Sequence, residues 1–537
     1  MSRNRSSMSS GYFSWAFYAL LVSVRFSFVI FHSPGYLHPD EFFQSIELAA
    51  HDIYTNACTF LTWEFQSSGH GPVRSRSSIY PLAHLPIKAA SRLLPNVHTS
   101  HLSGNDFVDR LLLPTRLATS FLSFIPDFFI FYLSRNLESK EHQKVPLALL
   151  LYSSMAYGGL LWNTRTLSNI WESAAVSAFC YFSLRCSIFT LILQAFIAGW
   201  AIFLRPTFPI FVFPFIVFQL FNMVRSTKRL LNLFVYIPLG LLTAGGVVTL
   251  LAYLDTRYYT KLNLITSSDL VVTPARFFIY NSAEETLSEH GLHPWYHYML
   301  VHWPLILSPL LAPLAIFPPS CKGSNDGLRY AIWFSVIFST LILSMVGHKE
   351  TRFLLPSLPF AITLGALRAR RLKQLLVIWV IYQAVLVGFW GFTHQAGLLT
   401  FMRSIPSSDA ENVSLNIFFR TYMPPRFAFG EPASSLHNVP LECRKRFSFD
   451  QSKQCTRVVD FAGNSEAKLL AFLDCLKTYS PSNMVVRVVR LSWISIYNVC
   501  SSWGKFICTF NEVKMWKIVF PAEKLLSRTF PCTFFKH

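Results

Sequence analysis

Long apolar stretches separated by short polar turns dominate the hydrophobic pattern of this chain. Examples are residues 13–31, 121–133, 231–254 and 375–392. About 20 apolar residues are enough for a helix to cross the hydrocarbon core of a bilayer. The pattern therefore predicts an α-helical polytopic membrane protein with about eleven crossings, some of them short, tilted or broken. Their expected starts lie near Tyr12, Leu111, Val145, Ile170, Ile188, Thr207, Leu230, Leu300, Tyr330, Phe353 and Leu375.

The composition supports a membrane protein and argues against two other classes. Hydrophobic residues make up 52% of the 537 positions and charged residues only 14%, whereas average proteins contain about 25% charged residues. The first apolar run is too long for a cleaved signal peptide, so we expect it to remain as an anchor. The formal net charge of +19 is not accompanied by an RNA-binding motif, and we expect no nucleic acid partner.

Basic residues orient the predicted helices. With a cytosolic N-terminus, four basic clusters fall on the cytosolic side, as the positive-inside rule requires. These clusters are Arg3 and Arg5; Arg135, Lys140 and Lys144; Arg225, Lys228 and Arg229; and Arg368, Arg370, Arg371 and Lys373. An odd number of crossings then places the C-terminus outside the cytosol, and a glycosylation sequon at Asn412 is compatible with that side.

The same scheme predicts the domain organisation. Residues 1–400 form a transmembrane core that includes a first lumenal loop over residues 32–109, in which we expect amphipathic helices at the membrane interface. Residues 401–537 form a C-terminal lumenal region. Its cysteines are expected either to form disulfides or to remain buried thiols. They are Cys443, Cys455, Cys475, Cys500, Cys508 and Cys532.

Four unusual polar segments fall on one side of this topology. They cover residues 38–47, 162–169, 255–302 and 347–352. Their common side favours a composite active site at the lumenal surface. The competing class is a lipid transporter or scramblase, which would place charges along a path at the bilayer midplane. Arg25 is an exception to this one-sided placement, because it lies inside the first apolar run.

An acidic turn directly follows the first apolar run, in the stretch Gly-Tyr-Leu-His-Pro-Asp-Glu over residues 35–41. Pro39 suits the first turn of a helix, because a backbone N–H at that position would have no partner within the helix. Asp40, Gln44 and Glu47 would share one face of that helix, and Glu41 would point about 100° away. A transfer to a hydroxyl needs a base near the attacking oxygen, so Asp40 is our candidate. The alternative is that Asp40 only caps backbone N–H groups.

A second cluster combines three basic side chains with an acid at residues 348–353. His348, Lys349 and Arg352 would hold a lipid phosphate, because Lys supplies a point charge and Arg a bidentate fork. Such contacts also stabilise a phosphate leaving group. The alternative is ordinary anchoring of a helix end, in which long basic side chains reach the interface.

Further polar residues are candidates for substrate binding. The loop of residues 281–297 is rich in His and aromatic side chains, as sugar-binding surfaces are. Its histidines also have a spacing compatible with a metal, but we expect none, since basic side chains can neutralise the phosphate. Arginines at helix ends have snorkelling as their alternative role. The candidates are Arg165, Asn169, Glu172, Arg205, His290, His293 and His297, together with His38 and Gln44 of the acidic turn.

Taken in order, these segments resemble glycosyltransferase family 22. The matching segments are the His-Pro-Asp-Glu stretch and residues 164–172, 204–207, 255–259, 289–297 and 348–353. Members of that family are multispanning mannosyltransferases of the endoplasmic reticulum with the GT-C fold. The resemblance covers roughly residues 12 to 400, and the ordered set is more specific than any single motif. It implies that this chain is an enzyme of that kind.

Within the family, residues 36–44 resemble the members that add the fourth, side-branch mannose to the glycosylphosphatidylinositol (GPI) precursor. The third-mannose members and the lipid-linked-oligosaccharide members are the alternatives. Ile46 departs from the pattern, where Pro is expected. The resemblance implies dolichyl phosphate mannose as donor, the GPI glycolipid as acceptor and inversion at the transferred sugar. It implies that Asp40 acts on the attacking hydroxyl, and that Glu41 and the His290–His297 loop shape the pocket.

Overall fold

The chain forms two compact units, each assembled from separate stretches of sequence. Unit 1 comprises Met1–His32, Thr62–Pro86 and Thr115–Val387, and unit 2 comprises Ser33–Leu61, Ile87–Pro114 and Gly388–His537. The acidic turn therefore belongs to the unit that contains the C-terminal residues. The division at residue 400 stays a prediction. The computed structural model describes residues 2–54, 59, 61–67, 71–93, 108–137, 145–185, 187–225, 227–262, 269–283, 291–319, 325–369, 373–403, 414–419, 421–425, 458–461, 465–479, 485–491 and 513–519.

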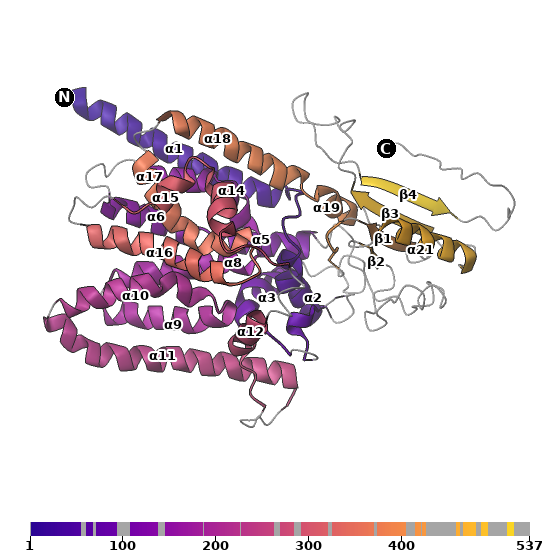
Figure 1. The fold of residues 1–537 in the computed structure, drawn as a ribbon, viewed down its shortest axis with the longest axis horizontal. Helices are drawn as coiled ribbons and strands as arrows, with labels where there is room; N and C mark the ends of the chain where they lie inside the picture. The colour runs from indigo at the N-terminus through magenta and orange to yellow at the C-terminus, as the bar shows by residue number, and fades with distance from the viewer. Residues whose placement is uncertain are drawn as a thin grey trace. The chain divides into compact units, whose positions relative to one another are not determined.

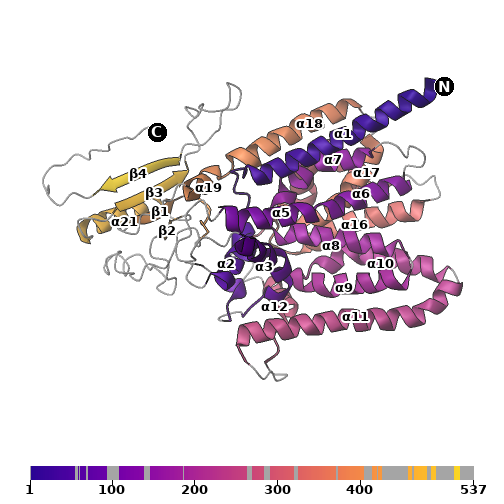
Figure 2. The ribbon, with the colours of Figure 1, turned by 180° about the vertical axis from the view of Figure 1, so that it is seen from behind.

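Unit 1 is built from helices, many of which lie side by side (Figures 1 and 2). Helices α9, α10 and α11 form one neighbouring group, and α16 lies against α10 and α17. The helices are α1 (Ser2–Ile30), α5 (Leu113–Leu122), α6 (Phe124–Leu137), α7 (Leu147–Ser154), α8 (Ser168–Ser183), α9 (Ile188–Leu204), α10 (Phe208–Val224), α11 (Thr227–Thr260), α12 (Thr273–Ser282), α14 (Trp303–Leu307), α15 (Ala312–Ile316), α16 (Asp326–Met345), α17 (Leu358–Ala369) and α18 (Lys373–Gly388).

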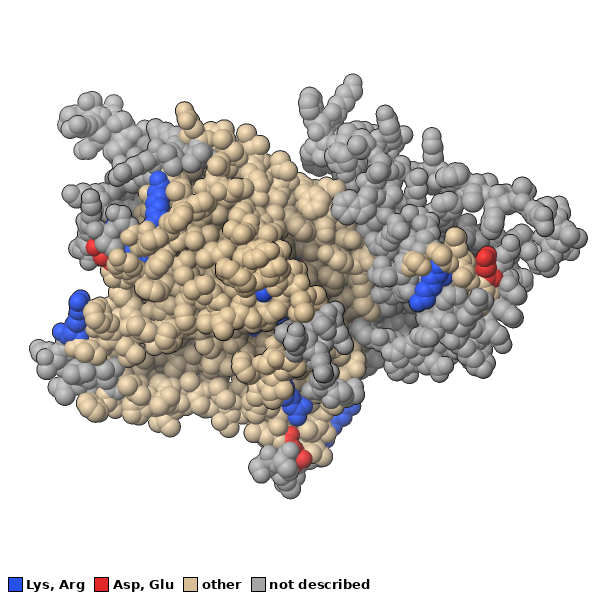
Figure 3. All heavy atoms as spheres, in the orientation of Figure 1, with Lys and Arg blue, Asp and Glu red and all other residues tan. Residues whose placement is uncertain are grey.

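The apolar helices confirm the prediction of an α-helical polytopic membrane protein. Within the described ranges, 5 helices are long and apolar enough to cross a membrane. They are Tyr12–Ile30, Arg110–Leu137, Phe234–Thr260, Asp326–Met345 and Leu376–Met402. Large apolar side chains of these helices face outward, and the face in Figure 3 is almost free of charge over the helices. Shorter apolar helices stand at other expected positions, and the total of eleven crossings stays a prediction.

A buried ion pair links α1 to α6. Arg25 is 0% exposed, and its Nη2 lies 2.8 Å from Oδ2 of Asp127. Its Nη1 donates to Ser123 Oγ at 2.7 Å, and the Tyr18 hydroxyl donates to Asp127 at 2.8 Å. A charge inside an apolar run is tolerated when it faces the bundle interior with a partner. Arg25 is therefore neutralised within the bundle.

Unit 2 contains short helices and a four-stranded sheet with strand order β2-β1-β3-β4. The strands are β1 (Ser414–Phe419), β2 (Val458–Phe461), β3 (Val485–Leu491) and β4 (Val513–Val519). β1 is parallel to β2 and β3, and β4 is antiparallel to β3. The helices are α2 (Glu47–Ile53), α19 (Ala396–Arg403) and α21 (Glu466–Tyr479), with α3 (Arg76–Leu93) shared with unit 1.

Aromatic side chains form part of the core of unit 2. Phe418 of β1 and Phe472 of α21 are both 0% exposed. The ring of Phe401 in α19 meets Phe418 edge to face, with centroids 5.7 Å apart. Cys475 of α21 is disulfide-bonded, which is the first of the two expected states for a C-terminal cysteine. The glycosylation sequon at Asn412 lies outside the described residues.

Candidate active site

The acidic turn begins a helix in unit 2 as predicted. The carbonyl of Pro39 accepts hydrogen bonds from the N–H groups of Phe42 and Phe43, at 2.9 and 3.1 Å. A π-helical turn, η1 (Phe42–Ile46), then precedes α2. A π turn contains an extra residue and is frequent at functional sites. That extra residue changes the face on which Glu47 stands relative to Asp40, and Glu47 is fully buried.

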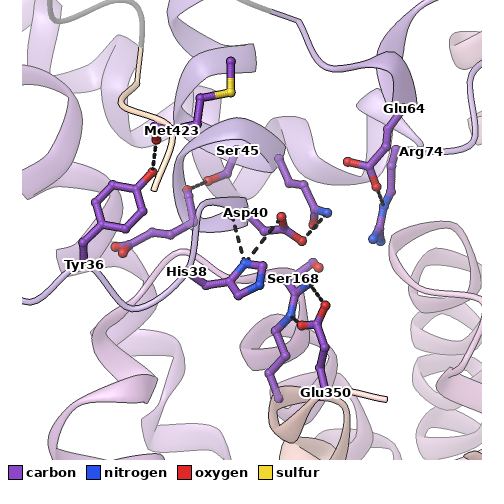
Figure 4. A network of polar contacts seen from close by, with 12 residues as sticks. Tyr36, His38, Asp40, Ser45, Glu64, Arg74, Ser168, Glu350 and Met423 are labelled. Carbon is purple, nitrogen blue, oxygen red and sulfur yellow. Dashed lines mark hydrogen bonds and ion pairs between the residues drawn. The ribbon is translucent and has the colours of Figure 1, made fainter. Parts of the chain in front are cut away.

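One neighbour holds the carboxylate of Asp40, and another holds its backbone. Gln44 Nε2 donates to Asp40 Oδ2 at 2.6 Å, which confirms that these two residues share a helix face. The Asp40 N–H donates to His38 Nδ1 at 3.1 Å, and that nitrogen lies 3.4 Å from Asp40 Oδ1 (Figure 4). The side chain of Asp40 is still 22% exposed. A carboxylate that is oriented yet accessible is suited to accept a proton from a hydroxyl that reaches it.

Residues near the C-terminal end of α18 and beyond it hold the chain just before this turn. The Gly35 N–H donates to Gly391 O at 2.8 Å, and a Cβ at Gly35 would lie 1.9 Å from Trp390 O. Only glycine allows this close approach of two backbones. The Tyr36 hydroxyl donates to Met423 O at 2.8 Å (Figure 4). Sequence analysis missed this support, because the partners are nearly 400 residues apart.

Tyr36 is also close to the acidic residues of the turn. Its ring stacks on Phe42, with centroids 4.7 Å apart, and it is 0% exposed. Burial raises the pKa of Tyr36 well above its usual value, and the charges of Glu41 and Glu47 raise it further. The hydroxyl therefore remains protonated and keeps its donor role. Glu41 itself is fully buried beneath the turn, away from the exposed carboxylate of Asp40.

The basic cluster at residues 348–353 surrounds one carboxylate in unit 1. Glu350 Oε1 lies 2.8 Å from His348 Nε2 and 3.1 Å from Arg352 Nη2, and Arg352 Nε also donates to this carboxylate. The Arg352 side chain is 6% exposed, whereas those of His348 and Glu350 are 18% and 24% exposed. The cluster is therefore accessible mainly at His348 and Glu350, while Arg352 is buried.

Lys349 connects this cluster to the His-rich loop. It is 3% exposed, and its Nζ donates to His293 O at 3.0 Å and to Val346 O at 2.6 Å. The His293 N–H returns a hydrogen bond to Gly347 O at 3.0 Å. Burial lowers the pKa of Lys349. The structure thus gives Lys349 a role in holding the loop, besides any contact with an anion.

A second ion pair joins α8 to the end of α9. Arg205 Nε lies 3.0 Å from Glu172 Oε2, and Arg205 Nη1 donates to Ser168 at 3.1 Å. The Thr207 hydroxyl donates to Glu172 at 2.6 Å. The guanidinium of Arg205 lies 5.3 Å from the ring centre of Phe353, and that of Arg352 lies 5.4 Å from it. Three of the four predicted polar segments are therefore neighbours in unit 1, and the segment with Asp40 belongs to unit 2.

The remaining candidates are also placed in unit 1 where the structure describes them. Arg165 and Asn169 are both 0% exposed. The rings of His293 and His297 lie 4.8 Å apart, while His290 lies outside the described residues. No group of three His, Cys, Asp or Glu side chains in the described ranges can hold a metal ion. The expectation that no metal is required stays a prediction.

The sequence of this chain matches one protein family over most of its length. A model described as the Alg9-like mannosyltransferase family matches residues 15–429. The chain belongs to this family. The match includes the acidic turn, the Glu172–Arg205 pair and the basic cluster, so the resemblance inferred from the ordered motifs is confirmed. The protein is a glycosyltransferase, and its membership also agrees with the predicted GT-C architecture.

Individual relatives cover most of this mannosyltransferase. It is 28% identical over 484 residues to "GPI mannosyltransferase 4" of Emericella nidulans, covering 84% of this chain and 82% of the relative. It is 26% identical over 387 residues to "GPI alpha-1,2-mannosyltransferase 3" of Bos taurus, covering 70% and 64% of the two chains. Among solved structures it is similar to ArnT from Cupriavidus metallidurans bound to undecaprenyl phosphate. That similarity has a TM-score of 0.45 at 13% identity and covers 72% of this chain and 70% of the other.

Asn169 provides a test of substrate binding in this mannosyltransferase. Neither polar atom of its buried amide has a hydrogen-bond partner in the part of the chain that the structure describes. An unsatisfied buried polar group costs about 1–3 kcal/mol, and a sugar hydroxyl would satisfy it. We expect Asn169→Leu to raise KM for a sugar-bearing substrate about tenfold while leaving the thermal midpoint unchanged or higher.

The matched control is Asn163→Leu, because the Asn163 amide donates to Tyr152 at 2.7 Å and is similarly buried. It should lower the thermal midpoint, since it leaves a buried partner unpaired. Kinetics and thermal unfolding of the purified variants give both quantities. A loss of stability in Asn169→Leu equal to that of the control, with KM unchanged, would refute a role in binding.

Proposed function

We propose that this mannosyltransferase adds the fourth, side-branch mannose to the third mannose of the GPI-anchor precursor, with dolichyl phosphate mannose as donor. The observation that carries the proposal is the similarity over 82% of a relative named "GPI mannosyltransferase 4". The Tyr36–Gln44 stretch supports it independently, because its Tyr-Leu-His-Pro-Asp-Glu-Phe-Phe-Gln form is typical of fourth-mannose enzymes. The partners are then the lipid-linked donor, the GPI glycolipid and the surrounding membrane lipids.

The proposed chemistry is a single displacement. The acceptor hydroxyl oxygen attacks the anomeric carbon of the mannose, and the bond from that carbon to the phosphate oxygen breaks. Asp40 accepts the hydroxyl proton, and dolichyl phosphate leaves with the bonding electron pair. A β-linked donor then yields an α-linked product. Gln44 positions the Asp40 carboxylate, and His38 fixes the Asp40 backbone by accepting its N–H.

The basic cluster has the proposed task of holding the donor phosphate. Arg352 supplies a fork of donors, and His348 and Lys349 add positive charge. Glu350 keeps the cluster from carrying uncompensated charge before the donor binds. The residues proposed to bind substrate in unit 1 are Arg165, Asn169, Glu172, Arg205, His290, His293 and His297. Glu41 of unit 2 is proposed to shape the surroundings of Asp40.

The pH dependence of donor binding tests the role of His348. Burial lowers the pKa of His348, but the hydrogen bond and charge of Glu350 raise it more, and the net pKa lies above the usual 6.5. The charged form therefore prevails below the raised pKa and is lost as the pH rises through it. We expect KM for the donor to increase about tenfold across that rise, the equivalent of one charge-assisted hydrogen bond.

Glu350→Gln should move this rise in KM to lower pH, because it removes the groups that raise the pKa of His348. His348→Gln should remove the pH dependence altogether. The measurement is the KM for the donor between pH 5 and 9 in the wild type, Glu350→Gln and His348→Gln. An unchanged profile in Glu350→Gln would exclude His348 as the titrating group.

We propose that the reaction requires no metal, because basic side chains supply the charge that neutralises the phosphate. Mannose transfer in washed membranes should then be unaffected by excess EDTA. A chelator-dependent loss that Mn²⁺ or Mg²⁺ restores would show that the proposal is wrong. A known metal-dependent glycosyltransferase in the same membranes is the positive control.

We further propose a location in the endoplasmic reticulum membrane, with a cytosolic N-terminus and with the active site and C-terminus in the lumen. The basic turns and the apolar helices support this orientation. Protease protection of tags at the two ends in sealed microsomes measures it directly. Protection of the C-terminal tag alone is the expected result.

The acceptor is tested by expression in cells that lack fourth-mannose activity, followed by mass spectrometry of GPI precursors. The three-mannose precursor should gain one hexose. The second candidate is a third-mannose enzyme, favoured by the similarity to the Bos taurus protein. In that case the gain appears on the two-mannose precursor in cells lacking third-mannose activity. A gain on lipid-linked oligosaccharide instead would contradict both GPI assignments.

A further inference from the structure

A basic cavity stands between the start of α3 and the end of α11, and the proposed reaction gives it no role. Its volume is about 570 Å³. Three cationic side chains line it, Arg76, Arg257 and Lys261, along with the rings of Tyr80 and Tyr258. All of these residues belong to unit 1. The 255–259 segment was one of the family-like motifs of the sequence, yet it contains none of the proposed reacting groups.

The cationic side chains are arranged to receive an anion. The guanidinium of Arg76 lies 4.3 Å from the ring centre of Tyr258 and 5.3 Å from that of Tyr80. Stacking on these two aromatic faces orients the planar guanidinium at the wall of the cavity. Arg257 and Lys261 are exposed, and neither forms an ion pair with another described residue.

The nearest carboxylate in the sequence is occupied in building the wall of the cavity. Asp255 is 0% exposed, and its Oδ1 accepts the Ser77 N–H at 2.9 Å. Its Oδ2 accepts the Thr273 hydroxyl at 3.1 Å. The Tyr259 hydroxyl also donates to Arg74 O at 2.8 Å. The Ser77–Asp255 bond joins α3 to α11, and the Tyr259–Arg74 bond joins α11 to the residues just before α3. Together they hold Arg76 opposite the basic end of α11.

The helix that ends at this cavity has an apolar surface that is open to lipid. Only 6% of the most apolar window of Phe234–Thr260 is buried. Leu242, Leu250 and Leu254 are 74%, 56% and 40% exposed, and Leu254 also lines the cavity. A hydrocarbon chain lying along α11 would bring its head group to the three cations. The surroundings therefore favour an amphiphile over a soluble anion.

We propose that this cavity binds the phosphate of an anionic membrane lipid, with Arg257 and Lys261 as its principal charges. The site differs from the basic cluster at residues 348–353, which shares no lining residue with it. It concerns lipid binding alone and does not depend on which sugar acceptor the enzyme uses.

The test measures lipid retention by the full-length protein in nanodiscs that contain equimolar phosphatidylcholine and phosphatidylinositol. Native mass spectrometry after release should show phosphatidylinositol retained preferentially on the wild type. The double variant Arg257→Gln/Lys261→Gln should retain it about 30-fold less. That factor corresponds to about 1 kcal/mol for each of two basic residues near an anionic lipid surface.

A matched control removes two exposed cations at other helix ends, in Arg185→Gln/Arg225→Gln. This control should retain phosphatidylinositol like the wild type. An equal loss in both double variants would mean that the cavity residues act only as interfacial charge, and the proposal would be wrong. Equal retention in the cavity variant and the wild type would also overturn it.

Two further measurements separate a charge effect from a folding defect, and a lipid from a free anion. Arg257→Lys/Lys261→Arg preserves the charge and should preserve retention, which separates a charge effect from a folding defect. Inorganic phosphate at millimolar concentration should not displace the bound lipid. Displacement by phosphate alone would identify a site for a free anion and would overturn the assignment to a lipid.

Discussion

Asp40→Asn is expected to reduce mannose transfer by roughly 10²–10⁴-fold, the usual contribution of a positioned general base. Asn preserves the size of the side chain and can still pair with Gln44, but it cannot accept the proton of the attacking hydroxyl. The Asp40 side chain is 22% exposed, so its replacement should leave protein stability nearly unchanged. Transfer is measured on GPI precursors, with the protein level determined in the same membranes.

Asp326→Asn is the matched control for this experiment. Asp326 also stands in the first turn of a helix, its side chain is 30% exposed, and it pairs with Arg329 at 3.7 Å. It lies in none of the proposed binding segments, so transfer should be retained. Full transfer by Asp40→Asn at a normal protein level would eliminate Asp40 as the base.

Asp127→Ala is expected to lower the free energy of unfolding by about 3–5 kcal/mol, since it leaves a buried charge without its partner. Arg25 has its closest ion-pair contact with this carboxylate, and Tyr18 loses an acceptor in the same variant. The protein level and the thermal midpoint in detergent should both fall. Mannose transfer per folded molecule should be nearly normal, because neither Arg25 nor Asp127 takes part in the proposed reaction.

The double variant Arg25→Met/Asp127→Leu separates charge from packing. Replacing both partners by apolar side chains of similar volume is often neutral or stabilising, and the surrounding bundle is apolar. We therefore expect the double variant to recover most of the lost thermal midpoint. A double variant as unstable as Asp127→Ala would show that packing around Arg25, and not its charge, dominates.

Local patterns predicted the features that depend on neighbours in the chain. Apolar runs predicted the helices, because a helix inside a bilayer satisfies its own backbone groups. The i, i+4 rule predicted the contact between Asp40 and Gln44. The spacing of His348, Glu350 and Arg352 was enough to suggest a charged cluster. The π turn after Glu41 was not predicted, since its apolar residues read equally well as an ordinary helix.

The remaining features depend on residues that are far apart in the sequence. Hydrophobic patterning by itself determined that this protein is a helical membrane protein, and the order of its motifs indicated the family. Only the tertiary structure decided that Arg25 pairs with Asp127, that Lys349 holds the His293 loop, and that α3 and α11 enclose a basic cavity. The physical reason is that hydropathy and helix periodicity describe residues within one helix, whereas these contacts arise from the packing of different helices, which no local pattern encodes.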